Sequence, residues 1–115
     1  MFAEYNYAYI PVPLFAIQSP YDTWSLRNIL GLYCENGGSL AGCQKAGVMD
    51  VIENYHESTF KVLKAIVNKS KSDNGFWAPS CANHCYVFGS SFYDSNYRIP
   101  ANSDYSLSKS ISNWM

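Results

Sequence analysis

Two ionisable residues stand where they could act together as an acid and a base. Asp22 follows an apolar run over residues 14–19, and His84 lies just beyond a second apolar run over residues 76–81. A histidine can accept and return a proton near neutral pH, and a neighbouring carboxylate can fix its tautomer and stabilise its charged form. Asp22 also has a simpler interpretation as a helix N-cap, since aspartate is favoured in that position.

The cysteines offer a second kind of chemistry. The chain has four of them in two close pairs: Cys34 and Cys43, and Cys81 and Cys85. This pattern suits two local disulfides in an oxidising compartment, although four cysteines allow three pairings. The alternative is a zinc site that uses His56 or His84, but the cysteine spacings do not match the usual zinc motifs. We therefore expect no metal and no cofactor.

Other candidate residues have simpler interpretations. Trp24 and Trp77 could line a substrate pocket near the acid and the base, but buried packing explains them about as well. Asn68 begins the sequon Asn-Lys-Ser, a glycosylation signal that also arises by chance. We interpret His56, on the edge of a helix face, as an exposed or capped histidine.

The apolar pattern indicates which elements must position these residues. The runs over 14–19 and 76–81 are typical of strands that are buried on both faces. Apolar residues recur with helical spacing over 23–32, over about 44–68 and over 106–114. Residues 34–43 are expected to form a glycine-rich loop. Two strands joined by a long helix predict part of an open α/β sheet, whose carboxyl edge collects ligand-binding residues.

Composition narrows the classes of protein that the chain can belong to. With 115 residues, 48% of them hydrophobic and 15% charged, it is expected to form one globular unit with a single core. A net charge of -1 without a strong basic patch argues against nucleic acid as a partner. No apolar run approaches the 18 or more residues that a membrane span needs.

Two segments resemble the pectin acetylesterase/Notum family. Residues 15–28, FAIQSPYDTWSLRN, resemble the segment that carries the family's acid, and residues 75–85, GFWAPSCANHC, resemble the segment that carries its base. The cysteines, the long helix and the closing helix keep the family's order between and after them. The resemblance covers about residues 11–114, which correspond to the last third or so of a family member.

This resemblance implies a fold and a function. The fold is the C-terminal part of an α/β-hydrolase-like fold, with the last two core strands, flanking helices and an incomplete sheet, so residues 1–115 form one partial domain. The function is that of a secreted serine-type carboxylic-ester hydrolase, acting on acetylated polysaccharide in the plant-like branch or on an acylated protein in the Notum branch. The Cys-x-x-His-Cys ending is closer to the plant-like branch. Asp22 and His84 match the second and third members of a Ser, Asp, His triad.

The nucleophile that completes such a triad is expected upstream of this chain. A Gly-x-Ser-x-Gly-type elbow is absent, and Ser39, within GGSLAG, lacks a preceding strand and lies inside the predicted cystine loop. The chain also shows no signal peptide, so we expect a missing upstream portion and no hydrolase activity from the chain alone. The alternative hypothesis is a truncated, inactive relative that serves as a binding or structural module.

Overall fold

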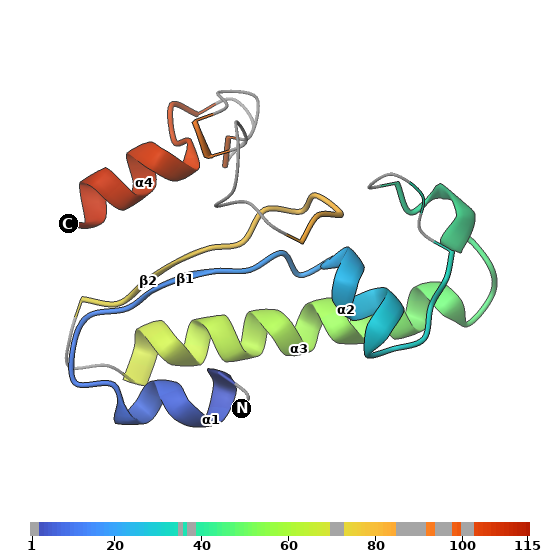
Figure 1. The fold of residues 1–115 in the computed structure, drawn as a ribbon, viewed down its shortest axis with the longest axis horizontal. Coiled ribbons are helices and arrows are strands. Elements are labelled where there is room, and N and C mark those ends of the chain that lie inside the picture. Colours follow the sequence, from blue (N-terminus) through green and yellow to red (C-terminus); the bar gives the residue numbers. More distant parts are fainter. Residues whose placement is uncertain are drawn as a thin grey trace.

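A computed structural model describes residues 3–34, 36, 39–69, 73–84, 92–93, 98–99 and 103–115. The elements in chain order are α1 (Ala3–Asn6), η1 (Tyr7–Tyr9), β1 (Phe15–Ile17), α2 (Thr23–Asn28), η2 (Ala41–Cys43), α3 (Val48–Lys69), β2 (Gly75–Trp77) and α4 (Leu107–Trp114). The ribbon shows α3 running along the strand pair, with α4 on the other side of β2 (Figure 1). Helices and a parallel strand pair together are compatible with part of an α/β fold.

The two strands pair in parallel, as the sequence predicts. Phe15 pairs with Gly75 and Ile17 with Trp77. The backbone N–H of Gln18 then donates to the carbonyl of Trp77 at 3.1 Å, which extends the pairing past β1. Because parallel strands end at the same edge of a sheet, the segments after β1 and after β2 leave side by side.

The strands are shorter and less buried than predicted. All three residues of β1 are half-buried, and Trp77 is the one fully buried residue of β2. The prediction of strands buried on both faces is therefore wrong for this chain. A parallel strand is buried on both faces only where helices cover both sides of its sheet, and the described residues do not cover β1 that fully.

The long helix α3 has the apolar face that its spacing predicts. Ile52, Leu63 and Ile66 are buried, whereas the charged side chains on the opposite face are exposed: Asp50, Glu53, Glu57, Lys61 and Lys64. The helix begins at Val48 rather than near residue 44, because Gly47 adopts a φ of +79°, outside the helical region. None of the described helices combines the length and the apolar character needed to cross a membrane.

The helix α2 ends earlier than predicted, while the start of α4 agrees with the sequence. Ile29 follows the last residue of α2, and Gly31, with a φ of +67°, turns the chain away before residue 32. At α4, the Ser106 hydroxyl accepts a hydrogen bond from the backbone N–H of Lys109 at 3.3 Å, so Ser106 is the N-cap.

Two buried clusters hold these elements together. Leu26 from α2, Cys43 from η2 and Ile52 from α3 form one cluster. Trp77 from β2 and Leu107 from α4 form the other. The first cluster anchors the helix that follows Asp22, and the second anchors the strand that leads toward His84, so both ends of the candidate site rest on packed apolar groups.

A disulfide between Cys34 and Cys43 confirms one of the predicted pairs. It closes the loop between α2 and α3, and its Cys43 side chain is fully buried in the first cluster. Gly42 lies so close to the Cys34 carbonyl oxygen that an added Cβ would come within 2.5 Å of it, so a larger residue would not fit there. The other predicted pair includes Cys85, which lies outside the described residues.

Replacing both Cys34 and Cys43 with alanine should lower the free energy of unfolding by about 2–3 kcal/mol, because a loop of this length loses less entropy on folding when it is already closed. Urea unfolding of the variant and the unmodified protein measures the difference. Ser39→Ala, an exposed change inside the same loop, is the matched control and should leave stability nearly unchanged. Equal stability of the double variant would contradict a stabilising role for this disulfide.

Candidate active site

Asp22 sits at the junction between β1 and α2, where its side chain is 2% exposed. One carboxylate oxygen, Oδ1, accepts a hydrogen bond from the backbone N–H of Ser25 at 2.7 Å, so Asp22 is the N-cap of α2. The other oxygen, Oδ2, accepts from the Gln18 side-chain amide at 3.0 Å. A buried carboxylate is costly unless donors surround it, and here both oxygens have donors from the protein.

His84 completes the set of hydrogen bonds to Asp22. Its Nδ1 lies 2.7 Å from Asp22 Oδ2, within the 2.6–3.2 Å that an acid and base pair requires. The predicted contact is therefore confirmed, and the N-cap interpretation of Asp22 holds at the same time because each oxygen serves a different partner. The His84 side chain is 46% exposed, so its imidazole bridges a buried carboxylate and the molecular surface.

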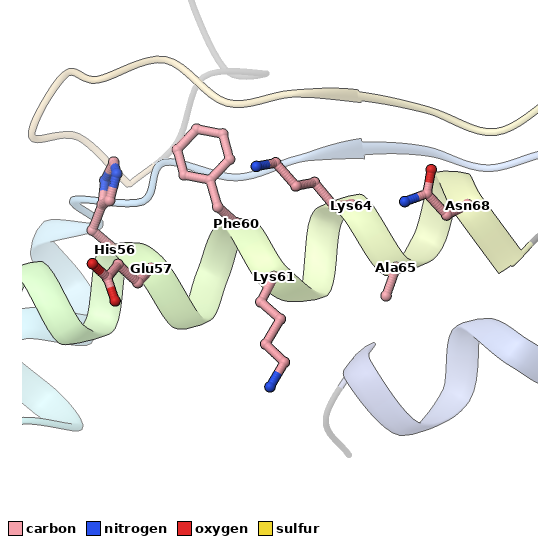
Figure 2. A pocket seen from close by; sticks show the side chains of 7 residues that line it. All are labelled: His56, Glu57, Phe60, Lys61, Lys64, Ala65 and Asn68. Carbon is pink, nitrogen blue, oxygen red and sulfur yellow. The ribbon is translucent and has the colours of Figure 1, made fainter.

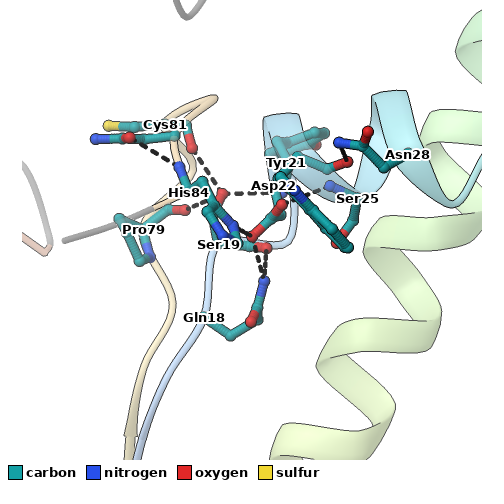
Figure 3. Close-up of polar contacts among 11 residues, drawn as sticks. Gln18, Ser19, Tyr21, Asp22, Ser25, Asn28, Pro79, Cys81 and His84 are labelled. Carbon is teal, nitrogen blue, oxygen red and sulfur yellow. Dashed lines mark hydrogen bonds and ion pairs between the residues drawn. The ribbon is translucent and has the colours of Figure 1, made fainter. Parts of the chain in front are cut away.

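Ser19 ties the segment that carries Asp22 to the segment that carries His84. Its hydroxyl is almost completely buried, donates to the carbonyl of Cys81 at 2.6 Å and accepts from the backbone N–H of Tyr21 at 3.0 Å. Figure 3 shows these contacts between the two segments beside the Asp22 and His84 side chains. The link joins residues more than 60 positions apart and fixes the spacing between the two segments.

The two candidate pocket tryptophans occupy different environments. Trp24 is 51% exposed, and its ring stacks on the His84 ring with centroids 5.6 Å apart and planes inclined by 23°. Trp77 is 4% exposed and packs with Leu107 in the second cluster. Trp24 thus lies beside the imidazole, whereas the burial of Trp77 favours the packing interpretation.

His56 belongs to an aromatic cluster next to the site. Its ring lies between those of Tyr21 and Phe60, with centroid distances of 4.8 and 4.9 Å. The Tyr21 hydroxyl points at Glu53 on α3, and burial, followed by the negative charge of Glu53, raises the pKa of this hydroxyl above its ordinary value of 10.0. Tyr21 therefore stays protonated at neutral pH, and the cluster braces the backbone next to Asp22 against α3.

A groove on α3 contains neither Asp22 nor His84. It has a volume of about 770 Å³ and follows α3, with the lining side chains seen in Figure 2: His56, Glu57, Phe60, Lys61, Lys64, Ala65 and Asn68. Asn68, the candidate glycosylation site, is exposed in the last turn of α3, and the rest of its sequon reaches outside the described residues. We therefore place the candidate chemistry at the strand ends rather than in this groove.

Ser39 does not occupy the strand-to-helix turn that a nucleophile elbow requires. It forms an isolated bridge with Asn36 in the loop that the disulfide closes, and its hydroxyl accepts from the backbone N–H of Ala41 at 3.3 Å. Across the described part of the chain, no three histidine, cysteine, aspartate or glutamate side chains gather into a set that could hold a metal ion.

Sequence reasoning missed three polar residues that hold the site together. Gln18 and Ser25 donate to Asp22, and Ser19 links the two segments. A signal was present, because Gln18 and Ser19 are polar residues that directly follow an apolar strand and precede an ionisable residue. Polar side chains in that position are expected to face the strand ends rather than the core.

Comparison with known proteins places the chain in a family. A family model described as pectinacetylesterase matches residues 1–115. Pectin acetylesterase 11 and pectin acetylesterase 7 of Arabidopsis thaliana are each 22% identical to the chain over 120 residues, which cover 98% of the chain and 30% of each relative. The chain thus spans about 30% of the length of the curated relatives it matches, and no solved structure matches it. The two segments around Asp22 and His84 predict this family, and the family model covers the whole chain. The chain therefore belongs to the pectinacetylesterase family.

Proposed function

We propose that this chain supplies the acid and the base of a serine-type carboxylic-ester hydrolase, and that the nucleophilic serine comes from sequence outside residues 1–115. The observation that carries the proposal is the 2.7 Å contact between His84 Nδ1 and the buried Asp22 Oδ2. Family membership supports an esterase-type function for the protein that contains the chain. In this protein, residues 1–115 would be the last part of one α/β-hydrolase domain.

The direction of the Asp22–His84 hydrogen bond determines which imidazole nitrogen can act as a base. An ionised carboxylate only accepts hydrogen bonds, so His84 Nδ1 must carry the proton that lies between them. In the neutral imidazole the other nitrogen, Nε2, then holds the free electron pair. Because the His84 side chain is 46% exposed while Asp22 is buried, a serine hydroxyl can approach the imidazole without disturbing the carboxylate.

The reaction then follows from these roles. His84 Nε2 takes the proton of the serine hydroxyl as its oxygen attacks the acyl carbon, and the imidazolium returns that proton to the leaving alcohol. Water repeats the two proton transfers and releases the carboxylic acid from the acyl-serine. Asp22 remains a carboxylate throughout and stabilises the imidazolium through Oδ2. The Gln18 amide donates to that oxygen, and the Ser25 backbone N–H donates to the other one, Oδ1, so the whole carboxylate is held in place.

The substrate we propose is an acetyl ester of a pectic polysaccharide, as the names of the two curated relatives suggest for those proteins. The exposed Trp24, stacked beside His84, would form one wall of the substrate pocket. A Notum-like substrate, a lipid ester on a protein, is the alternative within the same chemistry. The Cys34–Cys43 disulfide supports a secreted protein, since disulfides persist in oxidising compartments.

Treating the full-length protein with diisopropyl fluorophosphate should abolish ester hydrolysis and leave one phosphorylated serine. The activated serine oxygen displaces fluoride from phosphorus, so the adduct marks the residue that His84 activates. Acetate release from acetylated pectin and peptide mass mapping measure the two effects. We expect the adduct at a serine outside residues 1–115.

Ser39→Ala serves as the control in this experiment and should be inhibited and labelled like the unmodified protein. An adduct on Ser39, or on another serine of this chain, would show that the nucleophile is not supplied from outside. Full activity after exhaustive treatment would show that the hydrolase is not of the serine type.

A further inference from the structure

We propose that Gln18 is a positioning residue of this site. Its side-chain amide holds Asp22 Oδ2 toward His84 and also reduces the negative charge that this oxygen presents to the imidazolium. The inference rests on the proposed function, because it assigns a task to a residue that acts through the Asp22–His84 pair. The donor atoms on Asp22 Oδ2 are Gln18 Nε2 at 3.0 Å and His84 Nδ1 at 2.7 Å.

The chemistry of its neighbours fixes the orientation of the Gln18 amide. Its Nε2 lies 3.0 Å from Asp22 Oδ2 and 3.1 Å from the backbone carbonyl oxygen of Ser19. Both neighbours are acceptors, so the NH₂ group must face them and the amide oxygen cannot take its place. Each N–H of the NH₂ group can serve one of the two acceptors.

The backbone of Gln18 is also held in place by a hydrogen bond. Its N–H donates to the Trp77 carbonyl at 3.1 Å, directly after the register pair of Ile17 and Trp77. Trp77 is buried in the second cluster, so the end of the strand pair next to Gln18 is packed. The Gln18 amide therefore reaches the Asp22 carboxylate from a backbone that is held in the strand pair, and Figure 3 shows the amide beside that carboxylate.

The hydrogen bond from Gln18 to Asp22 Oδ2 has two opposite consequences for His84. The Gln18 amide stops Asp22 from turning away, which keeps Oδ2 aligned with Nδ1. The same amide also shares the negative charge of Oδ2, so the imidazolium is stabilised less than it would be by an unshared oxygen. Gln18 thus influences both the rate and the pH at which His84 loses its proton.

Two substitutions test both effects in the full-length protein. Gln18→Met keeps the length and volume of the side chain but removes the donor, and it should lower kcat about tenfold with little change in KM, since a hydrogen bond to a charged group is lost. It should also move the lower midpoint of the kcat/KM profile upward by about one pH unit, because Asp22 Oδ2 then keeps its whole negative charge for the imidazolium. Gln18→Leu removes the same donor with a side chain of different shape and should show both changes.

Gln44→Met provides the matched control, because Gln44 is the other glutamine of the chain and is exposed far along the sequence from the site. It should match the unmodified protein in both measurements. A thermal melt of each variant shows whether the fold is kept. If methionine disturbs packing at position 18, the leucine variant decides through both measurements.

The inference is supported only if, in a folded variant that lacks the donor, kcat falls and the midpoint rises. An unmoved midpoint, or a folded Gln18→Met variant with unchanged kcat, would overturn it. His84→Ala, measured in parallel, separates this failure from failure of the proposed function. If His84→Ala keeps full activity, the proposed function is wrong, whereas an inactive His84→Ala with an unmoved midpoint counts against Gln18 alone.

Discussion

Replacing His84 with alanine should lower kcat for ester hydrolysis by the full-length protein by a factor on the order of 10⁶, the loss that follows removal of the base in a serine hydrolase. His84 is the base that the serine hydroxyl needs, and no described residue other than Asp22 shares a hydrogen bond with its ring. Its side chain is 46% exposed, so the substitution should not disturb folding. Initial rates on an acetyl ester at saturating substrate measure the effect.

His56→Ala is the matched control, since the chain contains two histidines. Its ring packs between Tyr21 and Phe60 rather than against Asp22, so its removal should affect stability more than kcat. Comparable losses of kcat in both variants, with the fold kept, would show that His84 is not the base.

The second large effect is expected from Asp22→Asn, which should lower kcat by a factor of about 10⁴. Asparagine is as good an N-cap as aspartate, so it can still accept the hydrogen bond from the Ser25 backbone N–H and keep the start of α2. It lacks the negative charge that stabilises the imidazolium, and its amide can hold His84 in the wrong tautomer. The loss should therefore appear in kcat rather than in stability, which a thermal melt checks.

Asp104→Asn is the control for this substitution, because the Asp104 side chain is 83% exposed and makes a long ion pair with Arg98. It should retain the activity of the unmodified protein. An Asp22→Asn enzyme with nearly full kcat would reduce Asp22 to its capping role.

The sequence was sufficient to predict the pair at the centre of the site. Asp22 and His84 each follow an apolar run, and parallel strands end at one edge, so the contact between them followed from the order of elements. Apolar spacing predicted the helices α3 and α4, and the close spacing of two cysteines predicted the Cys34–Cys43 disulfide. The two helices and the disulfide depend on local sequence patterns and on residues that are near one another in sequence.

The features that the sequence did not predict depend on packing between distant segments. Ser19 bonds the carbonyl of Cys81, and nothing in either segment alone indicates that partner. The burial of β1 was overestimated. An apolar sequence shows that a strand can be buried, but it does not show which other elements cover its two faces. The end of α2 and the start of α3 were set by Gly31 and Gly47, whose left-handed conformations the apolar spacing does not reveal.

The double variant Asp22→Ala/His84→Ala tests most directly whether these two residues act as one unit. If Asp22 acts only through His84, removing it from a protein that already lacks His84 should leave kcat within about threefold of His84→Ala alone, because residues that act as a unit are not additive. The single variant should still exceed the uncatalysed rate by roughly 10³–10⁴, so a further loss can be measured. A further fall on the order of 10⁴ in the double variant would contradict the account, since Asp22 would then contribute to catalysis independently of His84.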